Sequence, residues 1–290
     1  MLEKLTPLQQ RLAVSSVAIF ISLLAIFMAP VPAFKPIFTL LIAGTIGMAM
    51  WELFQIFKAK GLEPASKAGI FFGVLYAVAV AVSTQYKAAE MLPKFILLIS
   101  LLCCFLYYFS RGKSPLQNLS ATVFSLAYLA VTLSCMIRIV YFFDDHAVQD
   151  GRWWLLYTLV VTKMTDTGGF FIGKRFGKEK LAPYISPKKT KEGALGGFLA
   201  AVVCSFVLML LAKIIDYGAF QMTLWQSIWL GAGIGICALI GDLSESLLKR
   251  DGGIKDSNQV PGLGGMLDVV DSLVFSAPLV YIFLKVFMGP

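Results

Sequence analysis

The segment from Leu247 to Phe283, LLKRDGGIKDSNQVPGLGGMLDVVDSLVFSAPLVYIF, joins a charged, glycine-rich stretch directly to a long apolar run. The apolar run opens with two acidic residues, Asp268 and Asp271. An acidic side chain in a bilayer-spanning helix is costly, so such residues usually have a functional role. The segment therefore predicts a membrane protein with chemistry at the start of its last span.

The composition of the whole chain also indicates a membrane protein. The chain has 290 residues, of which 58% are hydrophobic and only 14% are charged. Soluble domains carry about a quarter charged residues. Runs long enough to cross a bilayer, about 20 apolar residues, occupy residues 12–29, 36–57, 68–85, 93–109, 119–143, 152–172, 194–215, 224–244 and 268–289. We therefore predict an all-α polytopic membrane protein with about nine transmembrane helices.

The basic residues predict the orientation of these helices. Loops are numbered here by the span that they follow, and the N-terminal segment counts as loop zero. Of the 25 Lys and Arg residues, 17 lie in even-numbered loops. The positive-inside rule then places the N-terminus in the cytoplasm and the C-terminus outside. The net charge of +8 thus reflects orientation and contact with anionic lipid, and we expect no nucleic-acid partner.

Polar residues divide the chain functionally. Residues 1–118 contain the first four spans and short loops, whereas residues 119–290 contain ionisable residues within the spans. Two long loops of this second region, residues 174–193 and 245–267, face the same side of the membrane by the charge rule. We therefore predict an N-terminal transmembrane region (1–118) and a C-terminal catalytic region (119–290), with both loops cytoplasmic.

The first candidate cluster follows the sixth span. Asp166 lies in that span, and the sequence SPKKTKEG places Ser186, Lys189, Thr190 and Glu192 just before the seventh. Ser186 or Thr190 can cap the seventh helix, and backbone N–H groups at such a start bind phosphate well. For most of the basic residues here, a solvated orientation signal is the simpler interpretation.

The second cluster lies on the last two spans. Two sets of polar residues recur at helical spacing, namely Asp242, Glu245, Ser246 and Lys249, and then Asp268, Asp271 and Ser272. Each set is expected to share one helix face. Carboxylates at one depth repel unless a cation lies between them, and hard oxygen ligands suit Mg²⁺. We therefore predict a Mg²⁺ site formed by Asp242, Asp268 and Asp271. The alternative has Asp268 as a favourable acid at a helix N-terminus and Asp271 paired with a lysine.

These two clusters resemble the phosphatidate cytidylyltransferase family (CDP-diacylglycerol synthases), whose members are polytopic membrane enzymes. The resemblance covers the C-terminal half and is strongest over residues 166–197 and 241–271; the first 118 residues resemble the family only in their hydrophobic spans. Positions that match the family signature are Ser246, Lys249, Arg250, Lys255, Asp256, Pro261, Gly264, Gly265, Asp268 and Asp271.

The resemblance implies transfer of the cytidylyl group of CTP to phosphatidate, with Mg²⁺ as cofactor and pyrophosphate as the second product, in phospholipid biosynthesis. It also implies a bacterial-type inner membrane, an active site facing the cytoplasm, and a homodimer. The implied catalytic residues are Asp242, Lys249, Asp268 and Asp271. The implied substrate-binding residues are Ser186, Lys189, Thr190, Ser246, Arg250, Lys255, Asp256, Gly264 and Gly265, with Asp166 and Glu192 as further candidates.

The chain departs from the signature at two positions, where Leu263 replaces a histidine and Val269 replaces an arginine. A phosphate nucleophile is already anionic near neutral pH, and transfer at phosphorus relies mainly on positioning and electrostatics. We therefore expect an active enzyme with altered phosphate contacts. The alternatives are a cytidylyltransferase acting on another lipid phosphate, a catalytically degenerate homologue, and a membrane transporter with a polar pathway through Glu52, Arg138 and Asp166.

Overall fold

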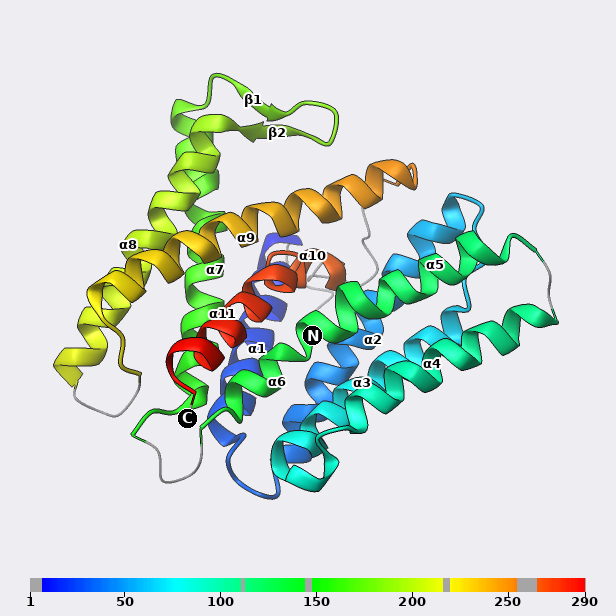
Figure 1. The fold of residues 1–290 in the computed structure, drawn as a ribbon. Helices are drawn as coiled ribbons and strands as arrows, with labels where there is room; N and C mark the ends of the chain where they lie inside the picture. Colours follow the sequence, from blue (N-terminus) through cyan, green and yellow to red (C-terminus); the bar gives the residue numbers. More distant parts are fainter. Residues whose placement is uncertain (1–6, 111–112, 144–147, 216–219, 255–264, 290) are drawn as a thin grey trace. The chain divides into compact units, whose positions relative to one another are not determined.

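The computed structural model describes residues 7–110, 113–143, 148–215, 220–254 and 265–289, with side chains from residue 16 onward except at 215. Helices make up nearly all of the described chain (Figure 1). They are α1 (Pro7–Met28), α2 (Lys35–Ala59), α3 (Ser66–Gln85), the 3₁₀ turn η2 (Lys87–Ala89), α4 (Leu92–Phe109), α5 (Pro115–Ser125), the π-helical η3 (Leu126–Val131), α6 (Cys135–Val140), α7 (Gly151–Phe176), α8 (Lys191–Ile215), α9 (Leu224–Asp251), α10 (Met266–Val270) and α11 (Leu273–Phe287). The all-α prediction is confirmed, apart from one short hairpin.

Seven helical stretches among the described residues are long and apolar enough to cross a membrane: Lys35–Ala59, Ser66–Gln85, Lys87–Phe109, Pro115–Val140, Lys191–Ile214, Leu224–Asp251 and Met266–Phe287. They correspond to all but the first and sixth of the predicted spans. The first is the helix α1, whose side chains are described only from Ser16. The sixth is α7, which is helical throughout but carries Lys163 and Asp166. The polytopic membrane fold is confirmed, and the number of nine stays a prediction.

The described helices group into two compact units. One comprises the chain up to Val131 together with Asp251–Val270, and the other comprises Thr132–Arg250 together with the chain from Asp271 onward. In the first unit α2 packs against α3 and α10, and its buried face includes Phe38, Ile46 and Leu53. The predicted functional division near residue 118 concerns chemistry and stays a prediction.

In the second unit α7 and α8 lie side by side (Figure 1). Glycines allow their backbones to approach closely. A Cβ atom at Gly196 would lie 2.4 Å from Ile172, and one at Gly197 would lie 2.6 Å from the carbonyl oxygen of Thr165. Small residues are typical of closely packed membrane helices. This contact sets the position of Asp166, which lies one residue beyond Thr165 on α7.

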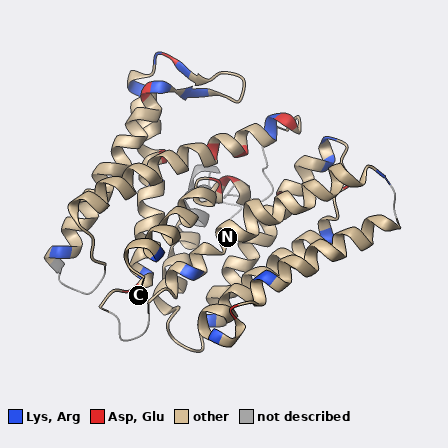
Figure 2. Ribbon diagram, in the orientation of Figure 1, with Lys and Arg blue, Asp and Glu red and all other residues tan. Residues whose placement is uncertain are grey.

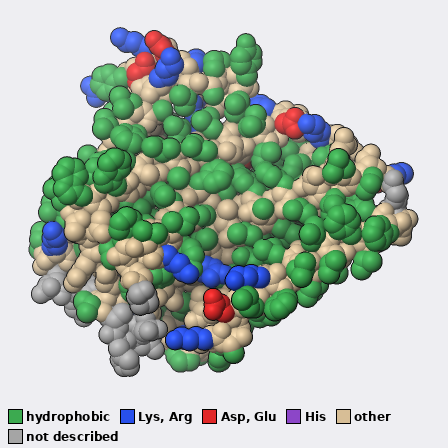
Figure 3. All heavy atoms as spheres, in the orientation of Figure 1, with side chains coloured by type: hydrophobic (Ala, Val, Ile, Leu, Met, Phe, Trp, Pro, Cys, Tyr) green, Lys and Arg blue, Asp and Glu red, His purple; other side chains and the backbone are tan. Residues whose placement is uncertain are grey.

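The segment predicted as a cytoplasmic loop, residues 174–193, is more ordered than a loop. Helix α7 continues to Phe176, and the strands β1 (Lys180–Ala182) and β2 (Ser186–Thr190) then form an antiparallel hairpin in which Lys180 pairs with Thr190. Lys and Arg positions colour much of the hairpin ribbon (Figure 2). Charged side chains gather there in the space-filling view, whereas hydrophobic side chains cover much of α8 and α9 (Figure 3). The hairpin therefore holds its lysines at fixed positions beside α8.

The prediction of one continuous helix for the ninth span is wrong in detail. Helix α10 ends at Val270, a turn follows at Asp271 and Ser272, and α11 begins at Leu273. The Asp271 side chain accepts a hydrogen bond from the backbone N–H of Ser272, and such local bonds compete with helical ones. The spacing argument for Asp268 and Asp271 assumed one unbroken helix, and it therefore does not apply across this turn.

Candidate functional site

The site begins on one face of α9. Asp242, Glu245 and Lys249 lie at the predicted spacing, and the side chains of Glu245 and Lys249 are 3% and 7% exposed. The ammonium of Lys249 forms an ion pair with the Glu245 carboxylate one turn earlier. A buried charge is tolerated when it is paired in this way. The predicted catalytic residue Lys249 thus lies beside Glu245. The sequence predicted Glu245 on the same helix face but did not include it in the Mg²⁺ site.

Asp271 reaches the same place from the turn between α10 and α11. Its side chain is buried, and Oδ1 accepts hydrogen bonds from the Ser272 backbone N–H at 2.5 Å and from the Ser272 hydroxyl at 2.9 Å. The turn lies directly against Gly241 of α9, where a Cβ atom would fall 2.3 Å from the carbonyl oxygen of Asp271. A glycine at position 241 is therefore required for this approach.

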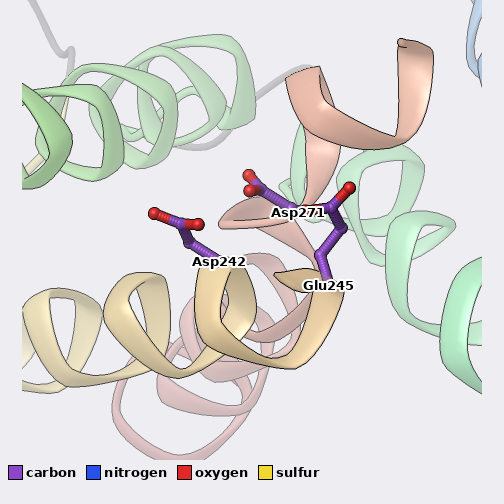
Figure 4. A group of neighbouring side chains, drawn as sticks. All are labelled: Asp242, Glu245 and Asp271. Carbon is purple, nitrogen blue, oxygen red and sulfur yellow. The ribbon is translucent and has the colours of Figure 1, made fainter. Parts of the chain in front are cut away.

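Three carboxylates converge here, from Asp242, Glu245 and Asp271 (Figure 4). Each offers one oxygen, and the three oxygens all lie within 4.8 Å of one another. Mg²⁺ binds oxygen ligands at 2.0–2.1 Å, so opposite ligands of its octahedron are about 4.2 Å apart. Adjacent ligands are only about 2.9 Å apart, so the three oxygens would have to draw closer together to share such an ion. In chemistry, the group fits a hard divalent cation.

Asp166 joins this group through a serine. The Ser272 hydroxyl lies 3.4 and 3.5 Å from the two carboxylate oxygens of Asp166 and 2.9 Å from that of Asp271. The Lys163 ammonium lies 3.4 Å from Asp166, three residues away on α7. Ser272 therefore connects acids of α7 and of the α10–α11 turn, and Asp166 belongs to the same polar region.

The hairpin contributes a cation to the group. The Lys189 ammonium on β2 lies 2.5 Å from Oδ2 of Asp242. The next residue, Thr190, accepts a hydrogen bond from the backbone N–H of Gly193 and so caps α8, as one of the two predicted alternatives required. The other candidate cap, Ser186, lies instead in β2.

Glu192 secures the base of the hairpin. Its carboxylate accepts hydrogen bonds from the backbone N–H groups of Lys178 at 3.0 Å and Glu179 at 3.3 Å. The side chain of Glu179 in turn pairs with Lys191 at 2.7 Å. Glu192 is thus placed to position the hairpin on the first turn of α8.

A cavity of about 460 Å³ lies beside these groups, within the second unit. Asp166 and Asp242 line it together with the basic residues Lys174, Lys188 and Lys189, and glycines of α7 and α8 form part of its wall. This volume is typical of a small-molecule site. A lining that carries lysines together with Asp242, one of the three converging acids, suits a metal-bound polyphosphate.

Other predicted residues lie around this region or elsewhere. Arg250 donates a hydrogen bond from Nε to the carbonyl oxygen of Ile185 at the hairpin turn, 3.1 Å away. Ser246 is half-buried on α9, and Gly265 is buried just before α10. Asp268 lies in the first turn of α10, in the first unit. Lys255, Asp256 and Gly264 lie outside the described residues, as do Pro261 and Leu263.

Comparisons with known proteins agree with one another. The model of the cytidylyltransferase family matches residues 9–287. A protein of Bacillus subtilis named phosphatidate cytidylyltransferase is 31% identical over 287 residues, covering 97% of this chain and 98% of its own. Proteins of the same name from Chlamydia pneumoniae and Synechocystis are 30% identical (96% of this chain, 92% of the relative) and 33% identical (85% and 87%).

Proposed function

Because this chain belongs to the cytidylyltransferase family, we propose that it transfers the cytidylyl group of CTP to phosphatidate, giving CDP-diacylglycerol and pyrophosphate. The printed names of the similar proteins support phosphatidate as the acceptor. The observation that carries the proposal is the convergence of Asp242, Glu245 and Asp271, with Asp242 also lining a lysine-rich cavity.

The reaction needs little covalent participation from the protein. A phosphate oxygen of phosphatidate attacks the α-phosphorus of CTP and forms a new P–O bond. The bond from the α-phosphorus to the bridging oxygen breaks, and pyrophosphate leaves with the bonding electron pair. The nucleophile is anionic near neutral pH, so the work left to the protein is positioning and charge stabilisation.

The acidic residues are proposed to hold Mg²⁺. Asp242, Glu245 and Asp271 supply the oxygen ligands, and Ser272 orients Asp271 by its hydrogen bond. A bound Mg²⁺ withdraws negative charge from the α-phosphate and from the leaving pyrophosphate. Asp268 is kept as a further proposed ligand on the strength of the sequence signature alone.

The basic residues are proposed to bind the phosphates. Lys189 and Lys249 each hold one acid of the cluster, and they are available to phosphates when a divalent cation takes over those acids. Lys174 and Lys188 line the same cavity. The remaining proposed substrate contacts rest on the signature: Ser186, Thr190, Ser246, Arg250, Lys255, Asp256, Gly264 and Gly265.

We further propose nine spans with the N-terminus in the cytoplasm, the C-terminus outside, and the site at the cytoplasmic face of a bacterial inner membrane. The distribution of Lys and Arg supports this orientation. The hairpin and the C-terminal end of α9, which carry Lys189 and Lys249, both fall on the basic side. CTP is then supplied from the cytoplasm, while phosphatidate is supplied by the bilayer.

The test uses purified protein in detergent micelles containing phosphatidate, with CTP labelled at the α-phosphate. We expect label to enter the lipid fraction only with Mg²⁺ present and to cease on chelation. Asp271→Asn should abolish the transfer, whereas Glu90→Gln, an exposed carboxylate on the first unit, should leave it unchanged. If the wild-type protein transfers no label to phosphatidate, the proposal is wrong; label on a different lipid phosphate identifies the other acceptor.

A further inference from the structure

Glu52 is a buried acid in the N-terminal region, which carries none of the signature. It lies in the apolar helix α2 and is 3% exposed. Its Oε1 accepts a hydrogen bond from the backbone N–H of Met266 at 2.8 Å, and its Oε2 accepts one from Leu267 at 2.8 Å. Hydrogen bonds to an ionised carboxylate are stronger than neutral ones. Glu52 therefore ties the start of α10 to the middle of α2.

The same face of α2 also contacts residues 251 and 252, which belong to the first unit. Ile56 lies one turn beyond Glu52, and a Cβ atom at Gly252 would fall 2.6 Å from its side chain and 3.0 Å from its carbonyl oxygen. One turn further, the Lys60 ammonium pairs with Asp251 at 2.5 Å. Residues four apart lie on one side of a helix, so Glu52, Ile56 and Lys60 form a single stripe.

We propose that this stripe is a positioning surface for residues 251–252 and 266–267, and that Glu52 is the positioning residue for Asp268. The stripe contacts both pairs of residues, and every one of these contacts lies within the first unit. Asp268 directly follows Leu267, whose N–H is fixed by Glu52. The inference rests on the proposed function, because it assigns Glu52 to the reaction through Asp268.

An acid is required at position 52 for a simple reason. Two backbone N–H groups point at its two carboxylate oxygens. In glutamine one of these oxygens becomes an NH₂ group, which cannot accept a hydrogen bond. One buried N–H would then lose its partner, which destabilises that arrangement. Glu52→Gln keeps the size of the side chain and removes only half of the anchor.

The first measurement is hydrogen exchange, which tests the anchor independently of activity. In wild-type protein the N–H groups of Met266 and Leu267 should be protected, and in Glu52→Gln their exchange should be about tenfold faster or more. The control is Thr39→Val, which removes a buried hydroxyl of α2 that donates a hydrogen bond to the carbonyl of Lys35 in its own helix. It should leave exchange at residues 266–267 unchanged.

The second measurement is cytidylyl transfer as a function of Mg²⁺ concentration. Loss of an outer positioning partner typically weakens metal affinity or activity about 10- to 100-fold. We expect Glu52→Gln to lower turnover and to raise the half-saturating Mg²⁺ concentration, whereas Thr39→Val should change neither. A purely structural role for Glu52 would lower the amount of folded protein without moving the Mg²⁺ dependence.

A charge exchange at the exposed end of the stripe tests the same idea without disturbing the core. Lys60→Glu and Asp251→Lys each place like charges together and should lower turnover several-fold, and the double variant should restore most of it. The inference is overturned if exchange at 266–267 is unaffected by Glu52→Gln, or if it rises while turnover and Mg²⁺ dependence stay at wild-type values. Failure of the proposed function is a separate result, namely no transfer by the wild-type protein.

Discussion

The Lys189 ammonium on β2 lies 2.5 Å from the Asp242 carboxylate on α9. This ion pair joins the basic hairpin to the acidic face of α9, and both residues line the same cavity. Lys189 is therefore expected to have two roles. It neutralises Asp242 of the proposed metal site, and its ammonium can bind a phosphate that enters the cavity.

Lys189→Met should impair substrate binding as well as catalysis. The variant leaves Asp242 without this partner and removes a cation from the cavity wall, so we expect kcat/KM for CTP to fall about 10- to 100-fold. Steady-state transfer kinetics measure the change. Lys180→Met, an exposed residue of β1 that does not line the cavity, is the control. Equal effects of the two variants would show that the loss reflects only the positive charge of the hairpin.

Ser272→Ala tests the connection between Asp166 and Asp271. The hydroxyl lies within 3.5 Å of both carboxylates. Its loss should leave the two carboxylates less well oriented, and no donor would then offset the repulsion between their negative charges. We expect a several-fold rise in the Mg²⁺ concentration for half-maximal transfer. Ser100→Ala, which removes a buried hydroxyl that donates to the carbonyl of Leu97 in its own helix α4, should not shift the Mg²⁺ dependence; an identical shift would argue against a specific bridge.

Glu245 and Lys249 form a buried ion pair whose partners should depend on each other. Removing one partner of such a pair costs about 3–5 kcal/mol, because the other charge stays buried and uncompensated. Lys249→Met and Glu245→Gln should each lower the free energy of unfolding, measured by denaturant titration in detergent. The double variant should recover much of the stability but none of the transfer activity. Additive losses in the double variant would mean that the two charges do not interact.

The sequence predicted most of the parts of this site and less of its geometry. Helical spacing was enough to place Asp242, Glu245 and Lys249 together, because α9 is continuous from Leu224 to Asp251. The same argument failed at Asp268 and Asp271, because it assumed an unbroken helix and the chain turns at Asp271. The preference of Asp271 and Ser272 for local hydrogen bonds is a weak signal that apolar periodicity conceals.

Contacts between residues far apart in the chain also could not be predicted from helical spacing. The pairing of Lys189 with Asp242, and of Glu52 with the start of α10, depends on tertiary packing between segments far apart in the chain. From the sequence, Glu52 was named only in the transporter alternative, in a polar pathway with Arg138 and Asp166. In the structure the guanidinium of Arg138 lies 5.6 Å from the centre of the Tyr281 ring, and the two carboxylate oxygens of Glu52 accept backbone N–H groups.

Gly197→Ala tests whether the close contact of α7 and α8 positions the site. The added Cβ atom would lie 2.6 Å from the carbonyl oxygen of Thr165, which is backbone and cannot move aside as a side chain can. We expect a loss of about 1–3 kcal/mol in stability and a fall in transfer, because Asp166 adjoins Thr165. Gly44→Ala on α2, where a Cβ atom meets nothing within 4 Å, should instead be neutral or stabilising by up to about 1 kcal/mol, since alanine favours helix. Thermal unfolding and transfer assays on both variants decide the matter: if Gly197→Ala is as harmless as Gly44→Ala, the interhelical contact does not determine where Asp166 lies.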